Sequence, residues 1–279
     1  MHGAGNSFLL TETLHGELQG EDLSGLALRL CSPETGPGAD GLIVLVPAEG
    51  EEDFGMLFYN SDGSLGEMCG NGARCAARYG VEQGLVREAA HIRIRATAGL
   101  VHARRLTEEQ YELRLNNPSV INLHRTAPDG TGTVDCVYTE LGEPGIPHAV
   151  LEVSPGAFDD LPLLRERGRA LRHSTAFPKG ANVSFVCMTG PKRLRAITYE
   201  RGVEDFTLAC GTGCGALALA MILRGRIAGE EVGIDMPGGH LSVRLRREGD
   251  TVRDLLLTGP TAVLGEGEFR LDAPRDVGL

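Results

Sequence analysis

Apolar positions along the chain gather in short segments that are typical of β-strands. Residues 41–46 are continuously apolar, whereas residues 91–97 and 240–246 alternate between apolar and polar side chains with a period of two. The same criteria predict further strands at residues 56–60, 111–115, 182–188 and 194–200. The chain is therefore predicted to be rich in β-structure.

Helical patterns are fewer. They occupy residues 22–30, residues 159–171 and two Ala-rich segments that begin after Cys69-Gly70 and Cys210-Gly211. Residues 216–223, in the last of these segments, are apolar on every side. A helix that is apolar all round is expected to be buried within a sheet structure.

The two halves of the chain are similar in layout. Tyr59 lies ten residues before Cys69, and Tyr199 lies eleven before Cys210, each at the end of a predicted strand. Strands around one apolar helix thus occur twice, with a crossover predicted at Asn116-Asn117-Pro118, where asparagine and proline favour a turn. The predicted fold class is α+β, with two similar β-rich domains. Each domain is a barrel-like sheet wrapped round a central helix, and the active site lies in the cleft between them.

Composition narrows the range of partners and compartments. The 279 residues carry 27 basic and 38 acidic side chains, a net charge of −11, which disfavours nucleic acid and anionic membranes as partners. The sequence has no apolar run of the roughly 20 residues needed to cross a bilayer, and no signal-peptide pattern at its start. With seven cysteines, an odd number, reduced thiols and a cytoplasmic location are expected.

Two matched cysteine motifs carry the candidate chemistry: residues 69–72 (Cys-Gly-Asn-Gly) and residues 210–213 (Cys-Gly-Thr-Gly). A cysteine where a helix begins lies near unpaired backbone N–H groups and the positive end of the helix dipole, which favour the thiolate. An unperturbed thiol pKa of about 8.5 is close enough to neutral pH for one thiolate and one thiol to coexist. Cys69 and Cys210 are therefore predicted to act as a base and an acid on opposite faces of one substrate carbon.

No cofactor or metal is expected. The glycine-containing segments at residues 3–6 and 36–38 lack the spacing of a dinucleotide or phosphate loop. Cys75 and Cys214 follow the motif cysteines at the unlike spacings Cys-x5-Cys and Cys-x3-Cys, whereas structural zinc sites favour tight Cys-x2-4-Cys ligands in matching pairs. The other three cysteines, interpreted as small buried apolar residues, are Cys31, Cys136 and Cys187.

Five segments, in order, resemble the diaminopimelate epimerase family: residues 1–6, 60–64, 67–75, 147–148, and 200–202 with 209–213. The resemblance implies a cofactor-independent epimerase that interconverts LL- and meso-diaminopimelate by a two-cysteine acid/base mechanism, in lysine and peptidoglycan precursor biosynthesis. It implies a small-molecule amino-acid substrate and is compatible with a homodimer. It also implies that the last strands, near residues 262–272, return to the first domain. The expected domains are residues 1–116 with 259–279, and residues 117–258.

The resemblance also assigns roles to single residues. Cys69 and Cys210 are catalytic, and His148 and Glu200 tune their pKa values. The substrate-binding residues are Asn6, Asn60, Gly70, Asn71, Asn182, Glu200, Arg201, Gly211 and Thr212. The charged pair suits an amino-acid group, because Arg201 can hold a carboxylate bidentately and Glu200 can accept from an ammonium group. Ile146 replaces an asparagine that is usual before Pro-His in the family, which bears on specificity.

Three alternatives differ in substrate or in class. A proline or hydroxyproline racemase-like enzyme would use the same cysteine pair on a smaller substrate. A binding protein without chemistry would not need both cysteines. A cysteine hydrolase needs one nucleophile activated by a histidine, so the second motif would have no role in it.

Overall fold

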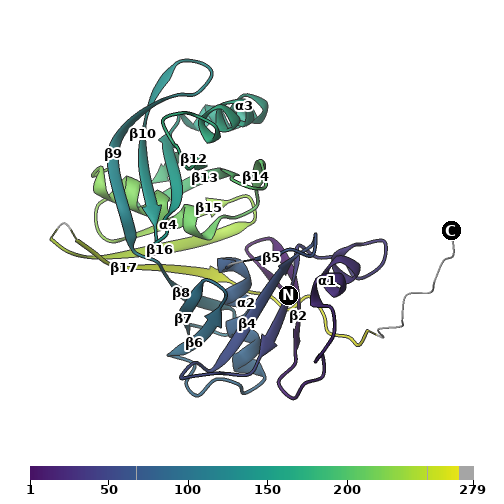
Figure 1. The fold of residues 1–279 in the computed structure, drawn as a ribbon. Helices are drawn as coiled ribbons and strands as arrows, with labels where there is room; N and C mark the ends of the chain where they lie inside the picture. The colour runs from purple at the N-terminus through teal and green to yellow at the C-terminus, as the bar shows by residue number, and fades with distance from the viewer. Residues whose placement is uncertain (67, 250, 270–279) are drawn as a thin grey trace, which may run out of the picture.

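The computed structural model describes residues 1–66, 68–249 and 251–269, which form two lobes (Figure 1). The first lobe contains β1 (His2–Gly3), β2 (Asn6–Glu12), α1 (Leu23–Cys31), β3 (Gly41–Val46), β4 (Phe54–Asn60), β5 (Leu65–Gly66), α2 (Gly70–Glu82), β6 (Ile92–Ala96), β7 (Gly99–Arg105) and β8 (Gln110–Leu115). The described helices include none that is long and apolar enough to cross a membrane.

The second lobe begins with a hairpin of β9 (Pro118–Pro128) and β10 (Thr133–Leu141). It continues with β11 (Ile146–Glu152), a 3-10 turn at Pro155–Asp159, α3 (Leu161–Arg172), β12 (Asn182–Gly190), β13 (Arg193–Glu200), β14 (Asp205–Thr207), α4 (Gly211–Leu223), β15 (Glu231–Met236), β16 (Gly239–Glu248) and β17 (Thr251–Pro260).

The lobes share one topology. In the first, β2 runs parallel to β3, β3 antiparallel to β4, and β4 parallel to β6, which continues antiparallel through β7 to β8. In the second, β11, β12, β13, β15, β16 and β17 repeat these relations in the same order. The prediction of two similar β-rich domains is confirmed.

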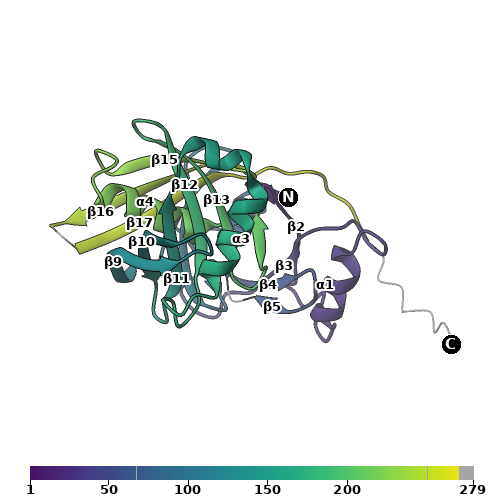
Figure 2. The ribbon, with the colours of Figure 1, turned by 90° about the horizontal axis from the view of Figure 1, so that it is seen from above.

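Each lobe buries one helix inside its sheet and packs another against the outside (Figures 1 and 2). Residues 213–222 of α4 are all buried, in a core formed with the surrounding strands, as the apolar sequence of this helix predicts. Helix α2 occupies the same place in the first lobe, although it carries two buried arginines, Arg74 and Arg78. The outer helices α1 and α3 begin at Asp22 and Asp160, whose side chains cap them.

The lobes are joined at two places. Asn116 and Asn117 separate β8 from β9, as predicted. Strand β17 pairs with β16 in the second lobe and, through residues 255–260, with β8 in the first. Ala262 then bridges to His2. In the described chain the expected final strand is absent from residues 263–269, and residues 270–272 lie outside the described residues. The exact domain bounds stay a prediction.

The burial of α4 predicts that its side chains contribute strongly to the stability of the fold. Leu217→Ala should lower the free energy of unfolding by about 2–5 kcal/mol, because it leaves a cavity in the core round this helix. Leu28→Ala on α1, where the side chain is 49% exposed, is the matched control and should change it by less than about 0.5 kcal/mol. Equilibrium urea denaturation measures both. Equal losses would contradict the central role of α4.

Candidate active site

The two cysteine motifs begin the two central helices, and these beginnings meet. Cys69 is the N-cap of α2 and Cys210 the N-cap of α4, both in extended conformation. A Cβ atom added to Gly70 would lie 4.0 Å from the Cα of Gly211, and one added to Gly211 would lie 3.8 Å from the Cα of Gly70. The helix N-termini therefore face each other where the lobes adjoin, and both cysteines border one site.

The surroundings of the cysteines follow the repeat. Asn60 ends β4 and pairs in register with the first residue of β3, while Glu200 ends β13, which pairs in the same way with β12. The two residues occupy equivalent strand ends, ahead of Cys69 and Cys210 respectively. Because one is neutral and the other acidic, the site is symmetric in backbone but not in charge.

The two thiols differ in their contacts. Cys210 is 5% exposed, and its Sγ accepts a hydrogen bond from the backbone N–H of Gly213 at 3.4 Å. The hydroxyl of Thr212 lies 3.7 Å from the same sulfur. Cys69 is half-buried, and in the described structure its side chain makes no capping hydrogen bond. The N-terminus of α4 therefore holds the Cys210 sulfur by a direct hydrogen bond.

Burial raises the pKa of both thiols, most strongly that of Cys210. The backbone N–H groups of Asn71 and Gly72 lower the pKa of Cys69, and that of Gly213 lowers the pKa of Cys210, as expected for helix N-termini. The expectation of a net lowering is nevertheless wrong, because the loss of hydration on burial outweighs these groups.

Glu200 acts on both cysteines. Its carboxylate accepts a hydrogen bond from the hydroxyl of Thr207 at 2.9 Å, and burial raises its own pKa. When ionised, its negative charge raises the pKa of Cys69 and of Cys210. This effect of the Glu200 charge on the two thiol pKa values fits its predicted tuning role.

His148 is fully buried, and neither ring nitrogen has a hydrogen-bond partner among the described residues. Burial, with the nearby charge of Arg201, lowers the pKa of His148 to about 3, so its ring is neutral at neutral pH. It pairs in register with Asn182 on the neighbouring strand. Its tuning of the cysteines stays a prediction.

The predicted amide residues mostly hold the protein's own groups. Asn71 donates to the Asn6 side chain at 2.7 Å, and the Asn182 side chain accepts from the backbone N–H of Arg201 at 2.8 Å. Asn60 donates to the Ser64 hydroxyl at 2.9 Å, within the turn between β4 and β5. Their substrate-binding role stays a prediction, and the Asn60 side chain stabilises the turn in which it lies.

Sequence reasoning missed residues that support the site from behind, among them Thr207 and Arg74. Thr207 orients the Glu200 carboxylate, and Arg74 donates to Asn71 at 2.9 Å. The available signal for Arg74 was a charged residue within the Ala-rich segment that follows Cys69-Gly70, a signal that Arg78 shares. All seven cysteines lie in the described residues as free thiols, and those residues contain no group of three or more His, Cys, Asp or Glu that could hold a metal ion.

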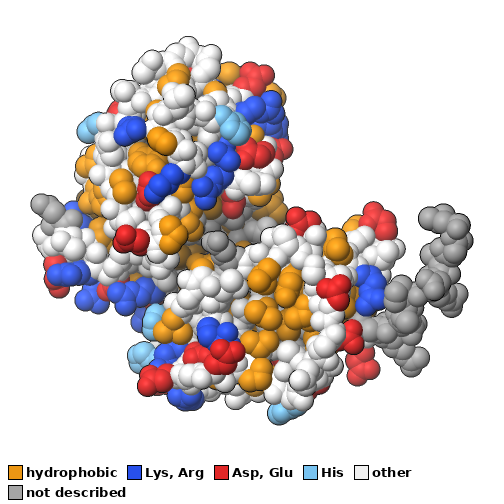
Figure 3. Space-filling model, in the orientation of Figure 1, with side chains coloured by type: hydrophobic (Ala, Val, Ile, Leu, Met, Phe, Trp, Pro, Cys, Tyr) orange, Lys and Arg blue, Asp and Glu red, His pale blue; other side chains and the backbone are white. Residues whose placement is uncertain are grey.

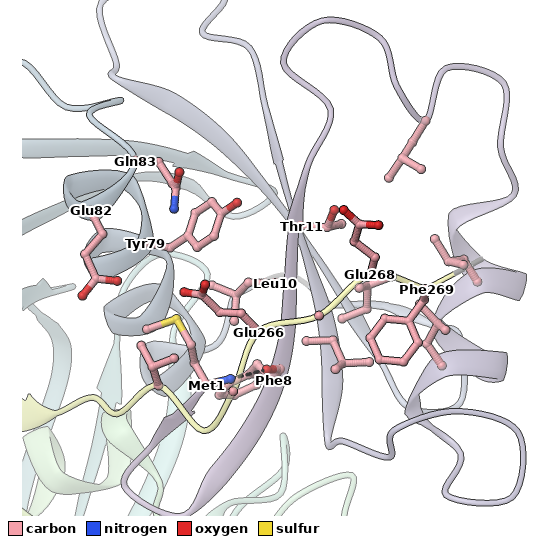
Figure 4. A pocket seen from close by; sticks show the side chains of 18 residues that line it. Met1, Phe8, Leu10, Thr11, Tyr79, Glu82, Gln83, Glu266, Glu268 and Phe269 are labelled. Carbon is pink, nitrogen blue, oxygen red and sulfur yellow. Dashed lines mark hydrogen bonds between the residues drawn. The ribbon is translucent and has the colours of Figure 1, made fainter. Parts of the chain in front are cut away.

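The first lobe contains a cavity that lies away from the cysteines. The space-filling view shows two lobes meeting at a waist, with apolar side chains gathered on the front of the first lobe (Figure 3). A cavity of about 630 Å³ is lined by Phe8 and Leu10 of β2, Tyr79 of α2, and the C-terminal segment at residues 263–269, which crosses β2 (Figure 4). The residues that line it include none of the predicted site residues.

Comparison with solved structures defines the class of fold. The chain superposes on a PhzF-family phenazine biosynthesis protein of Bacillus anthracis with a TM-score of 0.69 and 13% identity, covering 92% of this chain and 94% of that one. It superposes on a hydroxyproline epimerase of Agrobacterium vitis with a TM-score of 0.61 and 18% identity, covering 92% and 87%. At these identities the likeness shows the shared two-domain fold.

The sequence comparisons define the family. The diaminopimelate epimerase profile matches residues 1–120 and 142–263. The diaminopimelate epimerase of Chlorobaculum tepidum is 35% identical over 97% of this chain and 100% of its own length, and that of Aquifex aeolicus is 34% identical over 96% of each. That of Methanothrix thermoacetophila is 37% identical over 89% of this chain and 88% of its own. The chain belongs to the diaminopimelate epimerase family.

The electrostatic effect of Glu200 on both thiols predicts the result of removing its charge. Glu200→Gln should lower the pKa of Cys69 and of Cys210, because an ionised Glu200 raises both. The rate of thiol alkylation at each cysteine, followed by peptide mass spectrometry across a pH series, should then rise at lower pH. The matched control is Glu204→Gln, a carboxylate engaged by Arg172. If the pH dependence of alkylation is unchanged in Glu200→Gln, the Glu200 charge does not act on the two thiols.

The buried imidazole predicts sensitivity to acid. The folded pKa of His148 is about 3, against an ordinary value of 6.5, so below about pH 6.5 the unfolded chain binds a proton that the folded chain does not. The resulting loss of stability should reach about 2 kcal/mol by pH 4.5.

His148→Leu should remove this share of the loss, measured by urea denaturation at pH 7 and pH 4.5. His102→Leu is the control, because the His102 side chain is exposed and hydrated in both states. If the free energy of unfolding of His148→Leu falls between pH 7 and pH 4.5 as much as that of the wild-type protein, the His148 imidazole is not held neutral in the folded protein.

Proposed function

We propose that the protein is a cofactor-independent epimerase that interconverts LL- and meso-diaminopimelate. The observation that carries this proposal is the meeting of two cysteine-capped helices at one site, Cys69 on α2 and Cys210 on α4. The full-length relatives that are 34–37% identical and named diaminopimelate epimerase supply the substrate. The racemase-like alternative shares the fold, but its structural relatives lie below 20% identity.

Inversion requires two proton transfers on opposite faces of the α-carbon. One cysteine, as thiolate, takes the α-proton and becomes a thiol. The other, as thiol, gives its proton to the opposite face and becomes a thiolate. Negative charge passes onto the α-carboxylate as the first bond breaks. We assign the stabilisation of that charge to the N–H groups where the two helices begin, at Gly70, Asn71, Gly211 and Thr212.

The raised thiol pKa values indicate when the thiolate forms. Burial favours the protonated thiols. The α-ammonium group of a bound amino acid would bring positive charge beside the sulfurs and offset the lost hydration of a thiolate. Substrate binding would therefore generate the base at the point where it is needed.

The far end of the substrate carries a second ammonium and a second carboxylate. Glu200 is the last residue of β13, and Arg201 follows it directly. Arg201 is exposed, and its backbone N–H donates to the side chain of the buried Asn182. An arginine and a glutamate next to each other match a carboxylate and an ammonium on one carbon. Ile146, at the start of β11, offers only its backbone for such contacts.

We place this reaction in the cytoplasm, in lysine and peptidoglycan precursor biosynthesis, with no cofactor or metal and no nucleic-acid or membrane partner. Seven free thiols are what a reducing compartment maintains. The family resemblance supports the pathway and is compatible with a homodimer.

The first test is solvent isotope exchange. Incubation of the reduced protein with LL-diaminopimelate in deuterium oxide should move deuterium into one α-carbon and produce the meso isomer, as followed by NMR. Cys69→Ala and Cys210→Ala should each abolish epimerisation, because each removes the acid or the base for one face.

Cys136→Ala and Cys187→Ala serve as controls, since both cysteines are buried in the second lobe outside the site and should leave turnover near wild type. No exchange with the wild-type protein would overturn the proposal. Exchange with proline or hydroxyproline in its place would establish the racemase-like alternative.

A further inference from the structure

Arg74 is a fully buried charge one turn inside helix α2. Its side chain is 0% exposed, and it lies among the largest buried side chains of the described molecule. Burying a guanidinium costs free energy unless its donors are satisfied, so its contacts indicate what retains it. One terminal nitrogen donates to the side-chain oxygen of Asn71 at 2.9 Å, and the other to the carbonyl of Gly70 at 3.4 Å.

The Asn71 side chain links this charge to the second lobe. Its oxygen accepts from Arg74, and its amide nitrogen donates to the Asn6 side chain at 2.7 Å and to the carbonyl of Ala209 at 3.1 Å. Ala209 directly precedes Cys210. A chain of hydrogen bonds therefore runs from Arg74, through the helix that Cys69 caps, to the backbone that carries Cys210.

Arg74 determines which way the Asn71 amide faces. An asparagine amide can turn over and exchange its oxygen with its nitrogen, and it keeps the orientation that its partners require. Arginine donates only, so the atom beside it must be the oxygen. The nitrogen is then directed at two acceptors, one of them in the other lobe.

The fold makes room for this guanidinium. A Cβ atom on Gly259, in the strand β17 that joins the lobes, would lie 2.9 Å from the Cζ and Nε atoms of Arg74. The Nε atom has no hydrogen-bond partner among the described residues, so the group is not held there as a full structural ion pair. Its charge also lowers the pKa of Cys69 and of Cys214, which places it between the two central helices.

We propose that Arg74 is a positioning residue that sets the separation of the two cysteines. By fixing the Asn71 amide, it maintains the hydrogen bond to Ala209 that holds Cys210 against the N-terminus of α2. The consequence for turnover rests on the proposed epimerase activity, whereas the consequence for the distance between the thiols does not.

A double-mutant cycle tests the link. Arg74→Met and Asn71→Ala should each lower kcat by about 100-fold with little change in KM, because displacement of one catalytic group by about 1 Å has this effect. The double variant should be no slower than the slower single variant, because both substitutions break the same chain of bonds. Multiplying losses would overturn the proposal.

The rate of oxidative cross-linking reports on the separation of the two thiols, and it can be measured without substrate. Under a mild thiol oxidant such as diamide, the wild-type protein should form a Cys69–Cys210 disulfide, identified by peptide mass spectrometry, and Arg74→Met should lose it. A wild-type rate of cross-linking in Arg74→Met would overturn the proposal. If the wild-type protein lacks epimerase activity, the proposed function fails, and this measurement still decides the role of Arg74.

Two further variants separate positioning from folding. Arg78→Met, one turn along the same helix, removes a buried arginine that donates to Glu82 and to the carbonyl of Thr261, and it should keep kcat and cross-linking at wild-type levels. If Arg74→Met does not fold, Asn71→Ala alone should still lose the disulfide. A wild-type rate of cross-linking in Asn71→Ala, or an equal loss in Arg78→Met, would refute the positioning role.

Discussion

The approach of two helix N-termini inside one buried site is the constraint on which the rest of this molecule depends. Each helix is surrounded by its own sheet, so its first N–H groups can be directed only towards the opposite lobe. The approach is close: a Cβ atom on Gly70 or Gly211 would be in van der Waals contact with the Cα of the other, 4.0 and 3.8 Å away. The sheets, the repeated topology and the joining strand β17 together hold this geometry.

Burial of this site decides its electrostatics. The same enclosure that directs backbone N–H groups at the sulfurs removes the water that would hydrate a thiolate, and the second effect is larger. The repeated backbone carries unlike charges, with neutral Asn60 where the second lobe has Glu200. A duplicated fold thus provides equivalent positions for two thiols, and one carboxylate raises the pKa of both.

Most of the architecture could be predicted from the chain alone. The alternating segments gave strands close to their observed positions, and the all-apolar residues 216–223 predicted a helix within a sheet. Local periodicity is enough to predict these elements, because the spacing of apolar residues within a short segment indicates which face of a strand or helix is buried. The repeat was visible because matched motifs recur at similar distances from Tyr59 and Tyr199. The irregular course of residues 263–269 was not, since no local pattern separates it from a short strand.

The sequence by itself determined which residues are the candidates for the chemistry, since Cys69 and Cys210 stand in motifs that are informative without any structure. Only the tertiary structure decided what surrounds them: the burial that raises the thiol pKa values, the neutral His148, and the path from Arg74 through Asn71 to Ala209. The reason is that hydration and hydrogen bonding depend on groups more than 100 residues apart in the chain, such as Asn71 and Ala209.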